Sequence, residues 1–407
     1  MPSATLKIAL AALALATQTP ARAQTWIAQS SGTTASLRGV SAVSPAVVWA
    51  SGTRGTYLRT LDGGATWHAA VVPDAVDLDF RAVHALDGNT AWLMSSGPGD
   101  KSRIYKTADG GVHWSLLLTN PDANGFFDAL AFWDKAHGIV LGDQVRGRFV
   151  VLTTDDAGRT WQRRKTPPAL PDEGAFAASN SCLVVRGKRE VWFGTGGPGG
   201  ARLFHSKDGG RKWDVAPTPL RHGTAAGVFS LAFEDALHGV VVGGDYTKPE
   251  EAQENVAVTA DGGRTWVTPS GAHPNGYRSA VAFLAGRGIW IAVGTNGSDV
   301  SSDGGQSWRP LQPDGYHAIG AAGNDAVWAV GPAGRIARLT MTSATGCETF
   351  VTHAVTGRRL FDSGTRFPNR ARAASQDSGP GPAQVLVEWV NSSSPKMGGE
   401  LHRTRAT

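Results

Sequence analysis

An eight-residue motif that recurs six times is the feature that most restricts the fold of this 407-residue chain. Each copy follows the pattern Thr/Ser-x-Asp-Gly-Gly-x-x-Trp, with Ala replacing the first Gly in one copy. The copies are Thr60–Trp67, Thr107–Trp114, Thr154–Trp161, Ser206–Trp213, Thr259–Trp266 and Ser301–Trp308. They lie 42 to 53 residues apart, a period that accommodates four short strands and is typical of β-propeller blades.

The chemistry of the octet predicts a tight turn between two strands. An Asp carboxylate can accept hydrogen bonds from nearby backbone N–H groups, and Gly tolerates a positive φ at the next positions. The Trp can then pack on the base of the turn. We therefore expect a structural role for the six aspartates and six tryptophans, which are Asp62, Asp109, Asp156, Asp208, Asp261 and Asp303 with Trp67, Trp114, Trp161, Trp213, Trp266 and Trp308.

A seventh repeat unit is incomplete. Residues 317–322, 326–330 and 335–339 match the first three strands of the other units, but no octet follows them. The N-terminal segment Thr25–Gln29 begins with the same Thr-Trp pair that closes several octets. We expect this segment to supply the missing fourth strand, since closing the ring removes exposed strand edges. The predicted fold is all-β, a seven-bladed β-propeller over residues 24–340 that is closed by its N-terminal strand.

Composition and charge agree with this fold class and exclude others. The chain has 52 Gly and 14 Trp but only 18% charged residues, which argues against helical bundles and coiled coils. The net charge is +5, yet residues 24–340 carry equal numbers of basic and acidic residues. A general nucleic-acid binder needs a surplus of Lys and Arg to face phosphates, so we expect no nucleic-acid partner.

The N-terminus predicts export. Lys7, the apolar run Ile8–Ala16 and the cleavage pattern Ala21-Arg22-Ala23 form the three parts of a secretory signal, which we place at residues 1–23. The apolar run is too short to span a membrane, and no other segment approaches that length. We expect a periplasmic or secreted monomer without an integral membrane segment.

The C-terminal residues 341–407 lack the repeat. We interpret them as a low-order, mostly disordered tail. The alternative is that they are read-through sequence produced by a change of reading frame. Two cysteines, Cys182 and Cys347, are too few for a disulfide framework. Their pairing stays open between two free thiols and one bridge.

The octets match the Asp-box, also called the bacterial neuraminidase (BNR) repeat. With the predicted signal peptide, the seven units and second strands such as Trp49-Ala-Ser-Gly52, residues 25–340 most resemble the photosystem II stability/assembly factor family. The resemblance implies an exported seven-bladed propeller that, in photosynthetic members, helps to assemble membrane protein complexes. It implies a non-catalytic scaffold whose partner is a protein, such as part of a membrane protein complex. Fold likeness alone does not identify that partner.

No catalytic, cofactor or metal motif stands out. The octet aspartates fall one per blade, whereas a metal site needs several ligands around one ion, so we expect neither a metal nor a cofactor. The alternative function is a sialidase-like glycoside hydrolase, because Asp-box propellers include sialidases. The nearest match to the sialidase Arg motif, Phe80–Val83, lacks its Ile and Pro and is interpreted as structural. No obvious nucleophile stands out among Tyr57, Tyr105, Tyr246, Tyr277 and Tyr316.

Basic residues recur in the connections between second and third strands. We predict that they form a ring on one face of the propeller that binds an acidic or extended peptide, although solvated loop charges are the simpler interpretation. The predicted partner-binding residues are Arg54, Lys101, Arg103, Arg146, Arg148, Arg202, Lys248 and Arg335. A second candidate is the long loop Gly243–Asn255, which carries Tyr246, Lys248, Glu250, Glu251 and Glu254.

Overall fold

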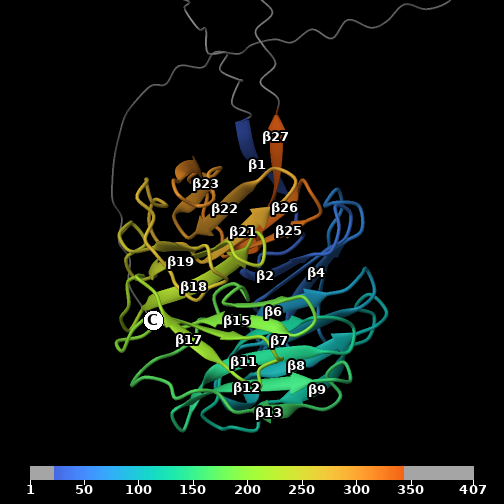
Figure 1. The fold of residues 1–407 in the computed structure, drawn as a ribbon. Coiled ribbons are helices and arrows are strands. Elements are labelled where there is room, and N and C mark those ends of the chain that lie inside the picture. The colour runs from blue at the N-terminus through green and yellow to red at the C-terminus, as the bar shows by residue number, and fades with distance from the viewer. Residues whose placement is uncertain (1–22, 343–407) are drawn as a thin grey trace, which may run out of the picture. The chain divides into compact units, whose positions relative to one another are not determined.

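The computed structural model describes residues 23–342, which form seven antiparallel sheets arranged as the blades of a β-propeller (Figure 1). The first strands of blades 1 to 7 are β2 (Leu37–Ala42), β6 (Phe80–Ala85), β10 (Phe127–Phe132), β14 (Leu183–Arg186), β18 (Ala226–Phe233), β21 (Ala280–Leu284) and β25 (Ala318–Ala322). Each contacts the first strand of the next blade, and β25 contacts β2, so these strands surround the central axis. The all-β, seven-bladed prediction is confirmed.

The other strands follow outward in each blade. The second strands are β3 (Val48–Gly52), β7 (Ala91–Ser95), β11 (Gly138–Val145), β15 (Glu190–Gly194), β19 (Gly239–Asp245), β22 (Ile289–Gly294) and β26 (Ala326–Val330). The third strands are β4 (Thr56–Thr60), β8 (Arg103–Thr107), β12 (Arg148–Thr154), β16 (Arg202–Ser206), β20 (Val256–Thr259), β23 (Gly297–Ser301) and β27 (Ile336–Thr342). The outer strands of blades 1, 2, 3, 4 and 6 are β5 (His68–Val71), β9 (Ser115–Thr119), β13 (Gln162–Arg164), β17 (Asp214–Pro217) and β24 (Arg309–Gln312). Short 3-10 turns are η1 (Gly99–Lys101) and η2 (Pro332–Gly334).

The N-terminal strand completes blade 7, as the incomplete seventh unit predicts. Strand β1 (Ala23–Gln29) pairs antiparallel with β27 over its whole length, from Ala23 opposite Thr342 to Gln29 opposite Ile336. Figure 1 shows the two strands, blue and orange, side by side. Blade 5 is the least regular, because its sheet has three strands and its outer edge is reduced to a bridge between Val258 and Val267.

Tryptophans of the second strands join neighbouring blades. The side chains of Trp49, Trp92, Trp192, Trp290 and Trp328 are at most 1% exposed. Trp92 Nε1 donates to the Ala157 carbonyl of the next blade at 3.1 Å. Large aromatic rings supply much of the buried area in such contacts, so the repeated Trp stabilises the interface between blades.

The octets form the predicted turns. The Asp62 carboxylate accepts hydrogen bonds from the Thr66 backbone N–H at 2.9 Å and from the Thr66 and Thr60 hydroxyls at 2.6 and 2.7 Å. Trp266 Nε1 donates to the Gly263 carbonyl of its own turn at 3.1 Å. The octets connect third to fourth strands, so they lie on the face where first strands end.

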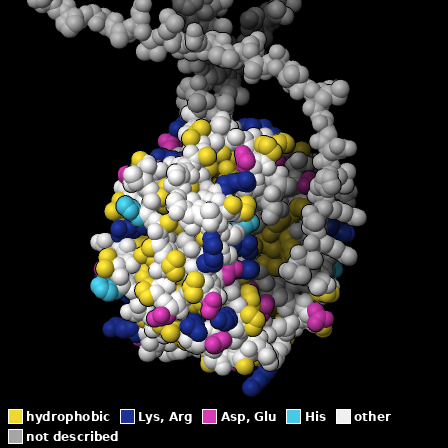
Figure 2. All heavy atoms as spheres, turned by 180° about the vertical axis from the view of Figure 1, so that it is seen from behind, with side chains coloured by type: hydrophobic (Ala, Val, Ile, Leu, Met, Phe, Trp, Pro, Cys, Tyr) yellow, Lys and Arg dark blue, Asp and Glu magenta, His cyan; other side chains and the backbone are white. Residues whose placement is uncertain are grey.

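The remaining expectations concern surface charge, membrane-spanning segments, the cysteines and the two ends of the chain. On the face seen in Figure 2, basic and acidic side chains are interspersed, in keeping with the neutral charge balance of residues 24–340. Within residues 23–342, no helix has the length and apolar character needed to span a membrane. Cys182 is buried and has no disulfide partner among the described residues. The predicted signal peptide, the tail and Cys347 lie outside the described residues.

Candidate functional site

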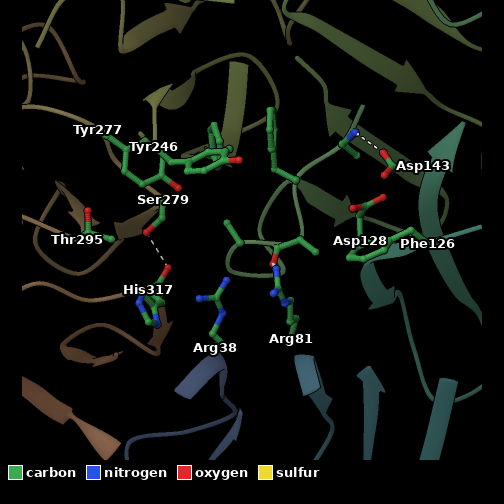
Figure 3. A pocket seen from close by; sticks show the side chains of 15 residues that line it. Arg38, Arg81, Phe126, Asp128, Asp143, Tyr246, Tyr277, Ser279, Thr295 and His317 are labelled. Atoms are coloured by element: carbon green, nitrogen blue, oxygen red, sulfur yellow. Dashed lines mark hydrogen bonds between the residues drawn. The ribbon is translucent and has the colours of Figure 1, made fainter. Parts of the chain in front are cut away.

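A cavity of about 450 Å³ lies at the centre of the ring, on the face where the first strands begin (Figure 3). Every blade contributes to its lining. The residues are Arg38, Arg81, Phe126, Asp128, Asp143, Ala175, Phe176, Ala177, Ala178, Phe229, Tyr246, Tyr277, Ser279, Thr295 and His317. The octet turns are on the opposite face, so the cavity is separate from the repeated Asp motif.

A β-bulge repeated in four first strands directs side chains into this cavity. The pairing between first and second strands skips one residue in blades 1, 2, 3 and 5, and the skipped residues are Arg38, Arg81, Asp128 and Phe229. A bulge leaves one residue unpaired and redirects its side chain. All four bulged residues line the cavity.

Glycines within the second strands make room beside the bulges. A Cβ on Gly142 would lie 2.4 Å from the Phe126 carbonyl, and one on Gly243 would lie 1.9 Å from the Gly227 carbonyl. Such distances are sterically forbidden, so the backbone entering the first strand can approach only a glycine. The glycine of Trp49-Ala-Ser-Gly52 has the same role, because a Cβ on Gly52 would lie 2.3 Å from the Ser36 carbonyl.

The lead-in to blade 4 crosses the axis and bridges the ring. Arg81 Nη1, from blade 2, donates to the Ala177 carbonyl at 3.2 Å. The Ser179 hydroxyl donates to the Ser279 carbonyl of blade 6 at 2.8 Å. Blades 2 and 6 are three places apart in a ring of seven, so a segment that reaches both within three residues must cross the centre. The bridging segment, Ala175–Ser181, lines the cavity with its first four residues.

The bridging segment is held on a third side by Asn180. Its side-chain amide accepts a hydrogen bond from the Leu130 N–H at 2.8 Å and donates one to the Leu130 carbonyl at 3.0 Å. These are the two backbone hydrogen bonds that a neighbouring strand would otherwise make. Asn180 has a φ of 67°, a left-handed conformation that Asn adopts more readily than most residues. The bridging segment is thus fixed to blades 2, 3 and 6.

Aromatic rings form one wall of the cavity. Phe176 and Phe229 are stacked with ring centroids 3.9 Å apart. Tyr277 and Tyr246 meet Phe229 edge-on at centroid distances of 4.8 and 6.1 Å. Tyr246 comes from the long loop after β19 and is 52% exposed, so it stands at the rim of this wall.

Two guanidinium groups from blades 1 and 2 lie near one another in the cavity (Figure 3). Arg81 Nε donates to the Asp79 carboxylate at 2.7 Å. Arg38 Nε is buried and has no hydrogen-bond partner among the described residues. Burial, and next the charge of Arg81, lower the pKa of Arg38 from its usual value. An anion in the cavity would relieve both effects, because it would offset the desolvation and the like-charge repulsion.

Two carboxyl groups line the blade 3 side. Asp128 is 1% exposed, and its Oδ2 has no hydrogen-bond partner among residues 23–342. Burial, with the nearby Asp143, raises the pKa of Asp128 well above its usual value. Burial also raises the pKa of Asp143, whose Oδ1 accepts the Ala175 N–H at 2.9 Å. Protonated carboxyls donate hydrogen bonds as well as accept them.

His317 is a neutral member of the lining. Its burial, followed by the charge of Arg38, lowers the pKa of His317 to about 4. Nδ1 lies 3.0 Å from the Leu37 carbonyl, which can only accept, so Nδ1 carries the proton and Nε2 is an acceptor.

The predicted basic ring lies away from this cavity, and none of its eight residues is among the lining side chains. Arg146 and Arg148 instead line a separate depression of about 470 Å³ with Arg163, Arg164 and Lys165. Arg202 is held by the buried Glu173 through an Nε–Oε1 bond of 2.9 Å. The other predicted residues make local contacts or face solvent: Arg54 with Thr34, Arg103 with Asp100, Lys248 with Glu251, Arg335 with the Gly315 carbonyl, and Lys101 exposed. The binding role of this ring stays a prediction.

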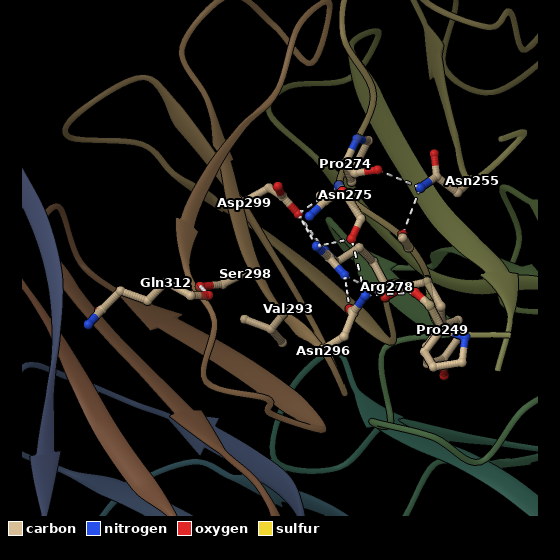
Figure 4. A network of polar contacts seen from close by, with 12 residues as sticks. Pro249, Asn255, Pro274, Asn275, Arg278, Val293, Asn296, Ser298, Asp299 and Gln312 are labelled. Carbon is tan, nitrogen blue, oxygen red and sulfur yellow. Dashed lines mark hydrogen bonds and ion pairs between the residues drawn. The ribbon is translucent and has the colours of Figure 1, made fainter. Parts of the chain in front are cut away.

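The long loop after β19 contributes Tyr246 to the cavity and is anchored to blade 6 (Figure 4). Asn296 Nδ2 donates to the Pro249 carbonyl at 2.8 Å. Arg278 in turn donates to Asn296 Oδ1 at 2.6 Å and forms a fully buried ion pair with Asp299. The loop therefore rests on a polar network inside the blade.

The charged residues of the cavity were missed by the sequence interpretation. Phe80 is buried in the core, as expected of a structural motif, but the next residue, Arg81, lines the cavity. A signal was present, because Arg38, Arg81 and Asp128 each follow the apolar residue that opens a first strand. A charged residue at the same position of three successive units indicates that this position is not part of the hydrophobic core.

Comparisons with known proteins agree with the fold and with the family resemblance. No family model matches the chain. The chloroplastic photosystem II stability/assembly factor HCF136 of Arabidopsis thaliana is 26% identical over 114 residues, which are 27% of this chain and 26% of that protein. The aligned region therefore spans only about a quarter of the length of the plant relative.

Among solved structures, YCF48 bound to a D1 peptide is 20% identical with a TM-score of 0.54, covering 77% of this chain and 96% of that one. YCF48 from Cyanidioschyzon merolae is 19% identical with a TM-score of 0.53, over 77% and 98% of the chains. A GH74 enzyme from Niastella koreensis is 15% identical with a TM-score of 0.52, over 76% and 53%. The chain is thus a seven-bladed β-propeller similar to the photosystem II stability/assembly factors.

Proposed function

We propose that this protein is an exported, non-catalytic β-propeller that binds a polypeptide partner in its central cavity and thereby serves as an assembly factor. The single observation that carries the proposal is the cavity itself, where an aromatic wall meets polar groups of Arg38 and Asp128 that have no hydrogen-bond partner among residues 23–342. Concave, largely apolar sites with a few convergent polar groups are the usual form of a binding pocket.

The comparisons support a polypeptide as the ligand. One of the similar propellers was solved in complex with a peptide, and the plant relative is named as an assembly factor. Export rests on the signal pattern of residues 1–23, and the partner would accordingly be a protein exposed outside the cytoplasm.

Site-directed photocrosslinking tests the proposal. Benzoylphenylalanine is placed at Tyr246, which is at the rim of the cavity, and at Val112, which is 73% exposed in an octet on the opposite face. We expect a polypeptide from membrane extracts to crosslink at position 246 and not at position 112. Equal crosslinking at the two positions, or crosslinking at 112 alone, would refute the cavity as the binding face.

A glycoside hydrolase is the second candidate, favoured by the two carboxyls that converge on the cavity. Such enzymes pair a general acid of raised pKa with an ionised group. Here burial raises the pKa of both Asp128 and Asp143, so the two carboxyls are not divided into one of raised and one of lowered pKa. Burial also raises the pKa of Tyr277, which disfavours a phenolate nucleophile.

A panel of fluorogenic glycosides that includes sialosides separates the two candidates. We expect no turnover above that of the Asp128→Asn variant. Turnover that this substitution abolishes would establish the hydrolase and displace the binding proposal.

A further inference from the structure

A basic depression lies on the outer strands of blade 3, apart from the central cavity. Its volume is about 470 Å³, and five cationic side chains line it together with one carboxylate. These charged residues are Arg146, Arg148, Arg163, Arg164 and Lys165 with Asp122. No residue of this lining also lines the central cavity. The blade 3 depression is therefore a second candidate site, with a charge of its own.

A tight turn and a short outer strand gather these charges. Arg146 and Gly147 form the two-residue turn of the β11–β12 hairpin, with φ values of 56° and 73°, and Arg148 follows them. Two-residue turns with positive φ match the twist of the strands that they connect. Strand β13 pairs antiparallel with β12 and ends at Arg164, one residue before Lys165. The hairpin and the outer strand thus bring their basic residues to the same depression.

Most of these cations have no ion pair. Arg163 Nη1 pairs with the Asp122 carboxylate at 2.8 Å, and this is the one ion pair that the five cations form among the described residues. Arg164 Nε donates instead to the uncharged Thr153 hydroxyl at 2.7 Å. Five positive charges against one negative charge give the lining a formal charge of +4.

This positive charge is local. Residues 24–340 carry equal numbers of basic and acidic residues, so the surplus in the depression is balanced by an acidic surplus over the rest of the propeller. Like charges in one depression repel one another, and an anion bound between them offsets that repulsion. The depression therefore attracts anions, although the propeller as a whole is neutral.

The lining favours phosphate groups over a protein partner. Four of the five cations are arginines, and a planar guanidinium can bind two phosphate oxygens at once. Protein partners usually bind through aromatic or apolar residues seated in pockets. Phe149 is the aromatic residue of the lining and is only 1% exposed, and none of the large exposed hydrophobic residues among residues 23–342 lines the depression. The site thus offers charge without an apolar surface.

We propose that the blade 3 depression binds phosphodiester headgroups of an anionic bilayer and thereby holds the propeller against a membrane surface. The contact is electrostatic, since the lining exposes no large hydrophobic side chain that could insert among acyl chains. The predicted signal peptide would bring the chain to such a surface outside the cytoplasm. Clusters of Lys and Arg are typical of anionic-lipid binding, and each basic residue near the surface raises the affinity about fivefold.

Co-sedimentation of the full chain with vesicles tests the proposal. One set of vesicles is pure phosphatidylcholine, and in the other set one third of the lipid is phosphatidylglycerol. Both sets offer the same acyl chains, so the difference between them reports the anionic headgroups alone. We expect binding to increase with phosphatidylglycerol. The increase should disappear when NaCl is raised from about 0.1 M to about 1 M, which shortens the Debye length from about 10 Å to about 3 Å.

Two double variants with the same change of charge locate the contact. Arg146→Asn with Lys165→Gln removes two exposed cations of the depression, and Asn tolerates the positive φ of position 146. We expect this variant to lose roughly twentyfold in affinity for the phosphatidylglycerol vesicles. The control is Arg211→Gln with Lys212→Thr, which alters an octet on the opposite face and introduces residues that other octets have at these positions. The control should bind like the unaltered chain, and thermal melting confirms that both variants are folded.

The outcomes decide between this proposal and its alternatives. Equal binding to the two vesicle sets, or no binding to either, overturns it. An equal loss of affinity in the two double variants also overturns it, because binding would then follow net charge. If inorganic phosphate or hexaglutamate displaces the chain at the same concentration of charge as the lipid, the ligand is a free phosphate or an acidic peptide instead of a bilayer. Crosslinking at position 246 is independent of these results, since the depression and the cavity share no residue.

Discussion

Trp26, four residues into the described chain, pairs with Leu339, four residues from its end, across strands β1 and β27. The Trp26 side chain is 5% exposed, and its Nε1 donates to the Ser298 hydroxyl of blade 6 at 3.0 Å. One side chain therefore joins the first strand to the last one and also to the neighbouring blade. The ring is closed by contacts between residues that are more than 250 positions apart.

Replacing Trp26 should open this closure. We expect Trp26→Ala to lower the free energy of unfolding by about 3–5 kcal/mol, the usual cost of removing a buried aromatic side chain. Removal of residues 24–30 should lower the melting temperature further, because it deletes the whole closing strand. The measurement is urea denaturation followed by tryptophan fluorescence and circular dichroism.

Ile27 supplies the control on the same strand, since it is 49% exposed. Ile27→Ala should change stability by no more than about 0.5 kcal/mol. An unchanged melting temperature after removal of residues 24–30 would contradict closure by the N-terminal strand.

The octets predict a loss of stability in acid. Hydrogen bonds from the turn hold the pKa of Asp109 and Asp156 at about 2, and that of Asp261 at about 2 despite a larger opposing effect of burial. These folded-state values lie below the unfolded value, so the stabilisation is present above about pH 4 and is lost as the pH falls toward 2. We expect the urea midpoint to fall steeply between pH 4 and pH 2.5. A constant midpoint over this interval would contradict the role of the carboxylates in the turns.

Much of the fold could be predicted because its determinants are local and repeated. The turn around Asp62 is made within one octet, and the same residues recur in five other blades. Closure by Thr25–Gln29 could also be predicted, since an incomplete seventh unit and an unused Thr-Trp pair are both visible in the sequence. Buried Trp side chains such as Trp49 follow from the same period.

The candidate site was missed because its determinants are not local. Arg38 and Arg81 point into the cavity through bulges, and a bulge is apparent only when the first and second strands are paired. The bridging segment Ala175–Ser181 belongs to one blade alone, so repetition gives no signal for it. The predicted ring, with residues such as Arg54, was inferred from loop position, which does not report distance from the axis.

Asp128 predicts a pH dependence of the opposite sign to that of the octets. Its folded-state pKa lies above the unfolded value because of burial. As the pH rises above about 4 the unfolded chain ionises first, so stability falls by at most about 1.4 kcal/mol per pH unit until the folded-state pKa is reached. Asp128→Asn removes this loss.

We therefore expect the stability of Asp128→Asn, relative to the unaltered protein, to increase from pH 4 to pH 8. The two proteins should differ little in their pH dependence below pH 4, where the carboxyl is protonated in both states. Urea midpoints at unit pH intervals provide the measurement. A difference that is independent of pH would show that the folded-state pKa of Asp128 is not raised.

Arg278 and Asp299 give the last prediction, because they form an ion pair in which each side chain is 1% exposed (Figure 4). Removing one partner leaves an uncompensated buried charge, so Asp299→Asn should destabilise the protein by about 3–5 kcal/mol. The matched control is Asp325→Asn, which breaks the exposed Arg287–Asp325 pair of 2.6 Å and should cost at most about 1 kcal/mol. Arg278 also bonds Asn296, which holds the loop bearing Tyr246, so the first variant should make that loop more sensitive to proteolysis. Equal destabilisation by the two substitutions, measured by urea denaturation, would show that the buried pair is not what supports this blade.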